Sequence, residues 1–386
     1  CPSPCSPAAM SLSKLTCSRL AAWCRRSVER VPVAVDPLPV LAENRPMETC
    51  IVGISALRSI RRMRVARRRP APSGNPRVEE IASNRREIED PQLRRCLEGD
   101  ETLHILTPAG RRNGHDRRLV QHACCVPLPE GSFNRHAPGV LVATPELCLL
   151  TMACGLGVNC LALLADEFCG GFALTPDETA FVRREPLVTL ADVTSFCEEV
   201  PGARGVNILR RAIRLAADGA ASPLEALVRH WLHVPVEHGG YGTGQSAFNV
   251  AVDVGEGFGS GMPARRTRVI DICYPRQRCG VECDGLQHES SAQSDDDAHR
   301  QTQLSNVGYR EERISWKQFS SYQRACEAGI AVRHMLGLRA RPVDGRMEDC
   351  RRELWKDLVA SPWAGVPLAV RPPDPSPGLG PAPPVA

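Results

Sequence analysis

The C-terminal half of the chain contains two short runs rich in strand-forming residues, 269–274 and 280–285, the first of them apolar except for one acid. Residues 275–278 between them have the composition of a turn, so the pattern predicts a β-hairpin. An amphipathic helix is expected to begin at Ser222 upstream, and residues 310–314 are typical of a further strand downstream. This order of elements predicts an α/β fold for residues 221–338.

The N-terminal half has a mixed pattern between residues 47 and 220, with short strand-like runs followed by longer helical ones. Thr144 and Pro145 are typical of a helix start, because Thr caps free N–H groups and Pro suits the first helical position. We therefore predict a mixed α/β accessory domain, with DNA binding as one candidate role. The expected strands are 103–106, 119–122 and 139–142, and the expected helices are 145–153, 192–200 and 207–217.

The two ends of the chain lack such patterns. Residues 1–46 mix Pro, Ser and Cys without periodicity, and we expect them to be disordered or a non-native extension. Residues 339–386 form a C-terminal extension, and its Pro-rich tail from Arg371 onward is expected to be disordered. Two Gly-rich stretches, 239–244 and 255–261, lack the GK[ST] ending of a phosphate-binding loop and are interpreted as connecting loops.

Charge and cysteine content narrow the partners and the compartment. The 386-residue chain has a net charge of +4, and seven arginines without any acid lie between residues 58 and 69. Such a run favours nucleic acid or another polyanion, and it is equally typical of a solvated arm. The 18 cysteines include no CxxC pair, and we find neither a persuasive signal peptide nor an apolar run of transmembrane length. We therefore expect a cytoplasmic protein with free thiols.

Three acids lie on the predicted hairpin. Asp271 is in the first strand, and Glu282 and Asp284 share one face of the second because side chains alternate along a strand. Carboxylates packed together raise one another's pKa unless a cation neutralises them. The pattern therefore predicts a site for Mg²⁺ or Mn²⁺, which both prefer oxygen ligands.

Each candidate residue also has a structural interpretation. Asp284 could simply begin a turn with the glycine that follows it. Glu225 stands three residues after Ser222, which is the spacing of a capping box. His288 is equally typical of a surface histidine. Asp271 is the least easily explained in this way, because an acid in an apolar strand costs stability unless it is paired or coordinated.

The run Glu-x-Asp-Gly-x-x-His, from Glu282 to His288, resembles a motif of the PD-(D/E)XK nuclease superfamily when Asp271 precedes it on its own strand. It is most similar to the very-short-patch-repair-like endonuclease domain, over residues 221–338. The resemblance implies a restriction-endonuclease-like fold, with a mixed central sheet flanked by helices, and a metal-dependent DNA endonuclease of defence or repair. The catalytic residues that it implies are Asp271, Glu282, Asp284, His288 and Glu225, with Asp271, Glu282 and Glu225 as ligands of Mg²⁺ or Mn²⁺.

One position departs from the superfamily pattern. The superfamily carries a lysine two residues after its second acid, and this position is Asp284 here. The very-short-patch-repair branch also lacks that lysine, so the change fits the branch. The general base therefore stays open between Asp284 and His288.

Four arginines are candidate contacts to nucleic-acid phosphates. Arg265, Arg266 and Arg268 come just before the first hairpin strand, and Arg300 lies in the polar helix expected after the hairpin. The first three could equally mark an exposed strand entrance. Arg300 could instead pair with the acids at residues 295–297.

Residues 51–220 loosely resemble the N-terminal part of abortive-infection-type antitoxins, on the segments 120–122 and 143–146 and the helix before Ser222. This resemblance implies an alternative function, a DNA-binding regulator whose nuclease fold is catalytically inert. A purely structural domain is the other interpretation, and His122 is expected to be a structural histidine.

Overall fold

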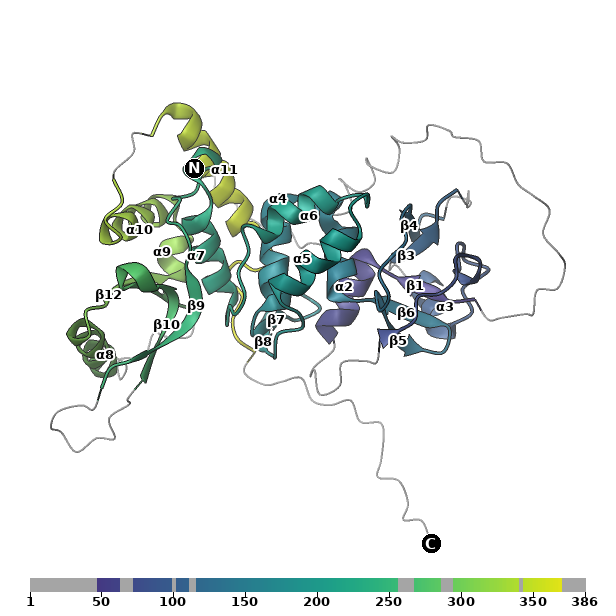
Figure 1. Cartoon of the computed structure of the whole chain (residues 1–386), viewed down its shortest axis with the longest axis horizontal. Coiled ribbons are helices and arrows are strands. Elements are labelled where there is room, and N and C mark those ends of the chain that lie inside the picture. The colour runs from purple at the N-terminus through teal and green to yellow at the C-terminus, as the bar shows by residue number, and fades with distance from the viewer. Residues whose placement is uncertain are drawn as a thin grey trace, which may run out of the picture.

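The computed structural model of the protein describes residues 47–62, 72–98, 102–110, 116–255, 267–285, 294–339 and 343–369. These residues form three sheets flanked by helices, so the predicted α/β class is confirmed. Figure 1 shows a six-stranded sheet at one end of the molecule, a four-stranded sheet at the other end, and helices between them. The expectations for residues 1–46 and for the tail from Arg371 lie outside the described ranges.

The six-stranded sheet is mixed, with the strand order β2-β5-β6-β1-β3-β4. Strand β1 lies inside it, parallel to β6 and antiparallel to β3, and is fully buried. Helix α2 packs its apolar face against β3 and β6, and the three strands expected from the sequence are all present. The elements of this part are β1 (Thr49–Ile51), α2 (Gly53–Arg62), β2 (Pro72–Ser73), η1 (Val78–Glu80), α3 (Pro91–Glu98), β3 (Leu103–Pro108), β4 (Leu119–Cys124), β5 (Phe133–Ala137) and β6 (Val140–Ala143).

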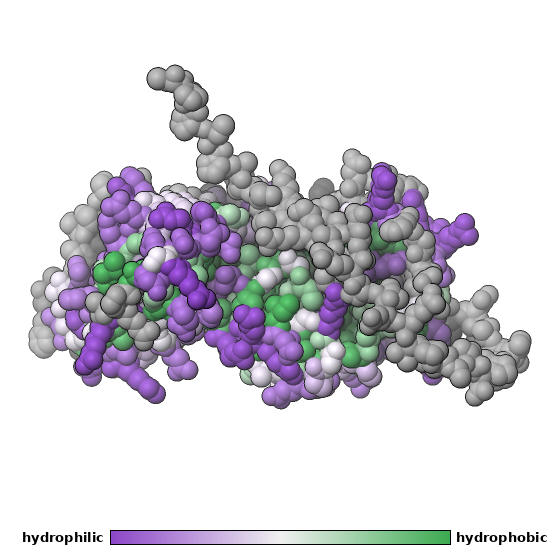
Figure 2. Space-filling view, turned by 90° about the horizontal axis from the view of Figure 1, so that it is seen from above, coloured by the Kyte–Doolittle hydropathy of each residue, from purple (hydrophilic) through white to green (hydrophobic). Residues whose placement is uncertain are grey.

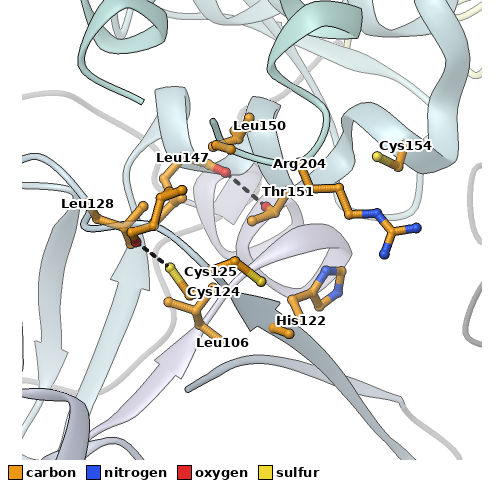
Figure 3. Close-up of a pocket in the computed structure, with 13 residues that line it drawn as sticks. Leu106, His122, Cys124, Cys125, Leu128, Leu147, Leu150, Thr151, Cys154 and Arg204 are labelled. Carbon is orange, nitrogen blue, oxygen red and sulfur yellow. Dashed lines mark hydrogen bonds between the residues drawn. The ribbon is translucent and has the colours of Figure 1, made fainter. Parts of the chain in front are cut away.

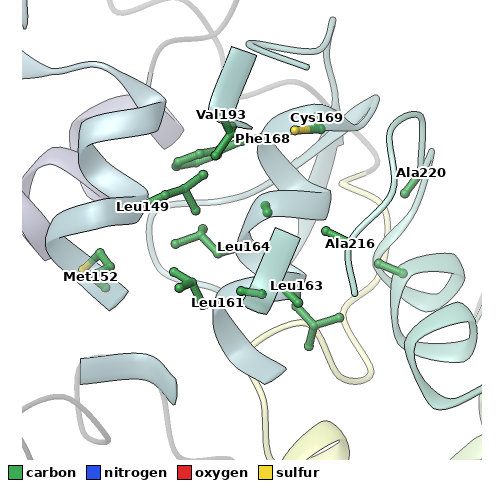
Figure 4. Packing of buried hydrophobic residues seen from close by; sticks show 14 of the residues in the cluster. Leu149, Met152, Leu161, Leu163, Leu164, Phe168, Cys169, Val193, Ala216 and Ala220 are labelled. Atoms are coloured by element: carbon green, nitrogen blue, oxygen red, sulfur yellow. The ribbon is translucent and has the colours of Figure 1, made fainter. Parts of the chain in front are cut away.

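Helix α4 (Pro145–Cys169) lies in the middle of the molecule and contacts helices of both halves, including α2 and α7 (Pro223–His233). Its C-terminal half is buried without interruption from Leu161 to Cys169. Figure 4 shows this half packed among apolar side chains from neighbouring helices, such as Val193. The helix therefore joins the two halves through one shared core.

The length of α4 corrects one expectation from the sequence. It is long and apolar enough to cross a membrane, whereas we expected no run of that kind. Two observations fit a core helix better than a span. Its side chains are mostly covered by other parts of the protein, and Gly157 breaks its regular geometry with φ 75° and ψ 174°. A residue without a Cβ is favoured there because φ is positive.

The segment after α4 contains a hairpin, β7 (Phe172–Leu174) and β8 (Phe181–Arg183), which the sequence did not indicate, and two helices that it did. Helix α5 (Leu190–Glu199) matches its prediction. Helix α6 (Val206–Ile213) ends before the predicted residue 217. Asp166 of α4 accepts a hydrogen bond from the N–H of Ala217 at 2.7 Å, so that N–H cannot continue the helix.

The predicted hairpin of the C-terminal half is confirmed. Strand β10 pairs antiparallel with β11, and the turn between them is the short helix η3. A strand that we did not predict, β9, lies between the two Gly-rich stretches and pairs antiparallel with β10. Strand β12 adds to β11 in parallel and completes the sheet order β12-β11-β10-β9. The elements are η2 (Val236–His238), β9 (Ala247–Asp253), β10 (Thr267–Tyr274), η3 (Pro275–Gln277), β11 (Cys279–Asp284), α8 (Ser294–Asn306) and β12 (Arg310–Ser315).

The C-terminal helices pack back onto the rest of the protein. Helix α11 (Gly345–Val359) contacts both α4 and α7, and it follows α9 (Trp316–Phe319) and α10 (Tyr322–Met335). One hydrophobic cluster runs from Cys50 to Trp363 and includes residues on both sides of position 220. Figure 2 shows apolar side chains gathered near the middle of the molecule, with hydrophilic ones around them.

Candidate functional site

Most of the acids singled out from the sequence line one cleft. It has a volume of about 360 Å³ and lies where the N-terminus of α7 meets β10 and β11. The segment Val366 to Leu368 forms another wall, and its backbone is bonded to Phe181 of β8. The charged residues of the lining are Arg183, Glu225, Asp271, Glu282, Asp284, Arg300 and Arg313.

Glu225 is both a helix-capping residue and part of the cleft. Its N–H donates to the Ser222 hydroxyl at 3.3 Å, and its carboxylate accepts from the N–H of Ala221 at 2.9 Å. The side-chain amide of Asn249 donates to the same carboxylate oxygen at 2.8 Å. Burial raises the pKa of Glu225, and the charge of Glu282 adds to the effect. Ser222 therefore caps α7, but the predicted capping box is not closed, because the Glu225 carboxylate accepts from the N–H of Ala221 and not from that of Ser222.

Asp271 lies at a break in the regular pairing of β10. The register with β11 covers Ile272 to Tyr274, and just beyond it the N–H of Cys283 donates to the Asp271 carboxylate at 2.8 Å. Burial, together with the charges of Glu282 and Glu225, raises the pKa of Asp271 to about 8. The three acids are thus close enough to repel one another.

Glu282 is held by Arg300. Both of its oxygens accept from the guanidinium, in the bidentate arrangement typical of strong Arg–carboxylate pairs. Arg300 also donates to the carbonyl of Val269 at 2.8 Å and to Glu311 at 3.1 Å. The partners of Arg300 in the structure are therefore groups on strands β10, β11 and β12.

Asp284 lies at the end of β11 and pairs with Arg313 at 3.2 Å. Arg313 and Glu311 were not among the residues singled out from the sequence. The alternation within β12 could have indicated them, because its parallel register places Arg313 beside Glu282 and Glu311 beside Gly280. Asn249 had no comparable signal, since its strand was taken for part of a loop.

Of the other predicted residues, Arg268 is described and does not line this cleft. Arg268 is buried under α8, where it donates to Gln303 at 2.7 Å, so it is not a surface phosphate contact. Arg265, Arg266 and His288 lie outside the described residues.

The predicted structural histidine has a partner. His122 lies 3.0 Å from His104, nitrogen to nitrogen, and burial lowers the pKa of His104 to about 3 and that of His122 to about 4. Figure 3 shows His122 at the edge of a small cavity, of about 70 Å³, that Cys124 and Cys154 also line. Two neutral histidines that share one hydrogen bond support a structural role.

Within the described ranges, no group of three or more His, Cys, Asp or Glu side chains is arranged to hold a metal ion. The donor chemistry nevertheless suits a hard cation, because Glu225, Asp271 and Glu282 offer carboxylate oxygens in one cleft. Arg300 at present neutralises Glu282. A cation could use Glu282 only where Arg300 releases it.

Comparison with models of protein families, with curated proteins and with solved structures found no match for this chain.

Proposed function

We propose that the protein is a metal-dependent nucleic-acid phosphodiesterase, a DNA endonuclease of the cytoplasm acting in defence or repair. The observation that carries the proposal is the meeting of Glu225, Asp271 and Glu282 in one cleft. They come from a helix and two strands that are distant in sequence. Burial raises the pKa of Asp271 and of Glu225, and repulsion from neighbouring acids adds to the rise. Acids held together at a cost to stability are typical of functional sites.

The order of elements supports a restriction-endonuclease-like fold for this half of the chain. Helix α7 precedes three antiparallel strands, β9, β10 and β11, then helix α8 and the parallel strand β12. This is a mixed sheet flanked by helices, with the acids on α7, β10 and β11. The same positions carry the motif that resembles PD-(D/E)XK nucleases.

Asp271 and Glu282, with Glu225, are the residues that would hold Mg²⁺ or Mn²⁺. Such an ion, when bound, supplies charge stabilisation for a phosphate and an activated water. Asp284 is placed to orient a water or to act as the general base, although Arg313 now pairs with it. Arg300, once displaced from Glu282, would be free to donate to a phosphate oxygen of the substrate.

A second function is supported by the ion pair itself. Glu282 has both oxygens occupied by Arg300, and the described residues form no ready metal site. A DNA-binding regulator that keeps the fold without the chemistry would look like this. In that case Arg300 and the other arginines of the cleft would contact DNA without taking part in catalysis.

Plasmid cleavage separates the two functions. The full-length protein and its Asp271→Asn variant would be incubated with supercoiled DNA and Mg²⁺ or Mn²⁺, with Asp253→Asn as a control, because Asp253 is exposed and does not line the cleft. Metal-dependent nicking that only Asp271→Asn abolishes would support the nuclease. A folded wild-type protein that shifts DNA without cutting it would favour the regulator, and cutting that survives in Asp271→Asn would refute this assignment of the site.

A further inference from the structure

A second polar pocket lies in the other half of the molecule, far along the chain from the acidic cleft. It has a volume of about 420 Å³ and is bounded by α2, by the start of α3 and by the end of β5. Helix α2 faces it with one stripe, Ser55, Arg58, Ser59 and Arg62, at the spacing of successive helical turns. The opposite face of α2 is buried in the core.

The two arginines of this stripe have no bonded partner among the described residues. Neither Arg58 nor Arg62 forms an ion pair or a side-chain hydrogen bond with any residue that the structure describes. Arg61, between them in sequence, points the other way and is bonded to Glu167 inside the protein. The helix therefore divides its arginines between a structural face and an open one.

The described residues of this lining carry more positive than negative charge. Asp90 is the one acid among the described residues of its lining, and its carboxylate already accepts from the N–H groups of Gln92 and Leu93 at 2.9 Å each, as the cap of α3. His136 and the hydroxyl of Ser59 add further polar groups to the rim. A ligand of this pocket should therefore be an anion with several acceptor oxygens.

The lining also favours backbone contact over base contact. Phe, Tyr and Trp are missing from the described residues that line the pocket, so among these residues only the smaller ring of His136 could stack on a base. Arginine forks match phosphate oxygens closely. In sequence, four more arginines follow Arg62 before residue 70, which suits a ligand with repeated negative charge.

We propose that the pocket of Arg58 and Arg62 binds backbone phosphates of a nucleic acid and anchors it independently of the acidic cleft. The contacts are to phosphate, so the binding is independent of base sequence. The anchor works whether or not the cleft is an active nuclease.

Fluorescence anisotropy with a labelled DNA duplex tests this in EDTA, where cleavage by the cleft cannot interfere. The variant Arg58→Gln/Arg62→Gln is compared with Arg324→Gln/Arg346→Gln, which removes the same charge from exposed positions on α10 and α11. We expect the first pair to weaken binding by about tenfold and to lower the salt dependence of log K by about two, one for each lost phosphate contact. The control pair should change neither by as much.

Ser59→Asp provides a second variant that keeps both arginines and should weaken binding through repulsion. Circular dichroism confirms that each variant is folded, and if the double variant is not, Ser59→Asp decides alone. Equal loss in the control pair, or unchanged binding in Ser59→Asp, would overturn the anchor. Inorganic phosphate at constant ionic strength is the last arm. Suppose that inorganic phosphate stabilises the wild type against unfolding but not the double variant, and that the double variant binds the duplex normally. The pocket then binds a small phosphate and the proposal is wrong.

Discussion

The molecule contains two buried groups of acids, one fully bonded inside the core and one that lines an open cleft. In the core, Glu167 receives two bonds from Arg61, at 2.7 and 2.8 Å, and one from the indole N–H of Trp363 at 2.9 Å. The third guanidinium nitrogen of Arg61, Nη1, donates to Glu178 at 2.9 Å. This cluster is closed, because both Glu167 oxygens are bonded and the buried Arg184 adds a second positive charge near Glu167.

The cleft is open and its charges do not balance. Asp271 and Glu225 are bonded only to neutral N–H groups and an amide, and Glu282 shares one arginine with Glu311. Burial and mutual repulsion raise the pKa of Asp271 and of Glu225. Burial of acids is therefore not enough to indicate a functional site. A functional site is indicated when acids outnumber bases beside an open cleft.

The largest expected effect is in the closed cluster. Glu167→Gln removes one charge of a pair whose side chains are 1% and 0% exposed, and it should destabilise the protein by about 3–5 kcal/mol because Arg61 is left incompletely neutralised. Urea unfolding followed by circular dichroism measures this. A decrease of less than about 1 kcal/mol in the free energy of unfolding would mean that this cluster stabilises the protein no more than an exposed ion pair does.

In the cleft, Arg300→Gln should cost less, about 2 kcal/mol, because hydrogen bonds to a charged group contribute about 1.5–3 kcal/mol. It should also free Glu282, so Mn²⁺ should raise the unfolding midpoint more in this variant than in the wild type. Arg313→Gln, which frees the more exposed Asp284, is the matched control. An identical Mn²⁺ shift in all three proteins would argue against a cation site at Glu282.

Asp271→Asn should instead stabilise the metal-free protein. The pKa of Asp271 is raised from 3.8 to about 8, so the folded state holds the proton more tightly than the unfolded state does. Its contribution to stability is therefore complete below about pH 4 and is lost as the pH rises toward 8. We expect the variant to be more stable than the wild type at the upper end of this window, by about 1.4 kcal/mol for each pKa unit of the shift, and to match it at the lower end. A constant difference across the window would contradict the shift.

The smallest effect is expected outside both clusters. Arg135 and Glu48 form a surface pair at 2.9 Å in which the arginine side chain is 48% exposed. Arg135→Ala should change the free energy of unfolding by less than about 1 kcal/mol. The same urea titration provides the baseline against which the buried clusters are judged.

Local pattern predicted the elements that carry their own signal. The strand-forming runs around Asp271 and Glu282 predicted the hairpin, and Thr144 with Pro145 predicted the start of α4. Strand β9 was missed because glycine-rich stretches on both sides concealed its short alternation. The early end of α6 was missed because Asp166 of another helix decides it.

Long-range partners were not accessible from the sequence. The acids of the cleft were predictable as a motif, but their relation to Arg300 depends on how α8 packs over the sheet. The bond between Trp363 and Glu167 joins residues 196 positions apart, and no periodicity reports a contact of that kind.

The strand-like segment at Val366 to Leu368 has a consequence for the order in which the cleft forms during translation. This wall is bonded to Phe181, whose N–H donates to the carbonyl of Pro367 at 3.0 Å, yet it is synthesised after every other residue of the lining. A growing chain can fold the acids of α7, β10 and β11 while this side of the cleft is still absent. The cleft therefore gains this wall last, after the acids on α7, β10 and β11 have been synthesised.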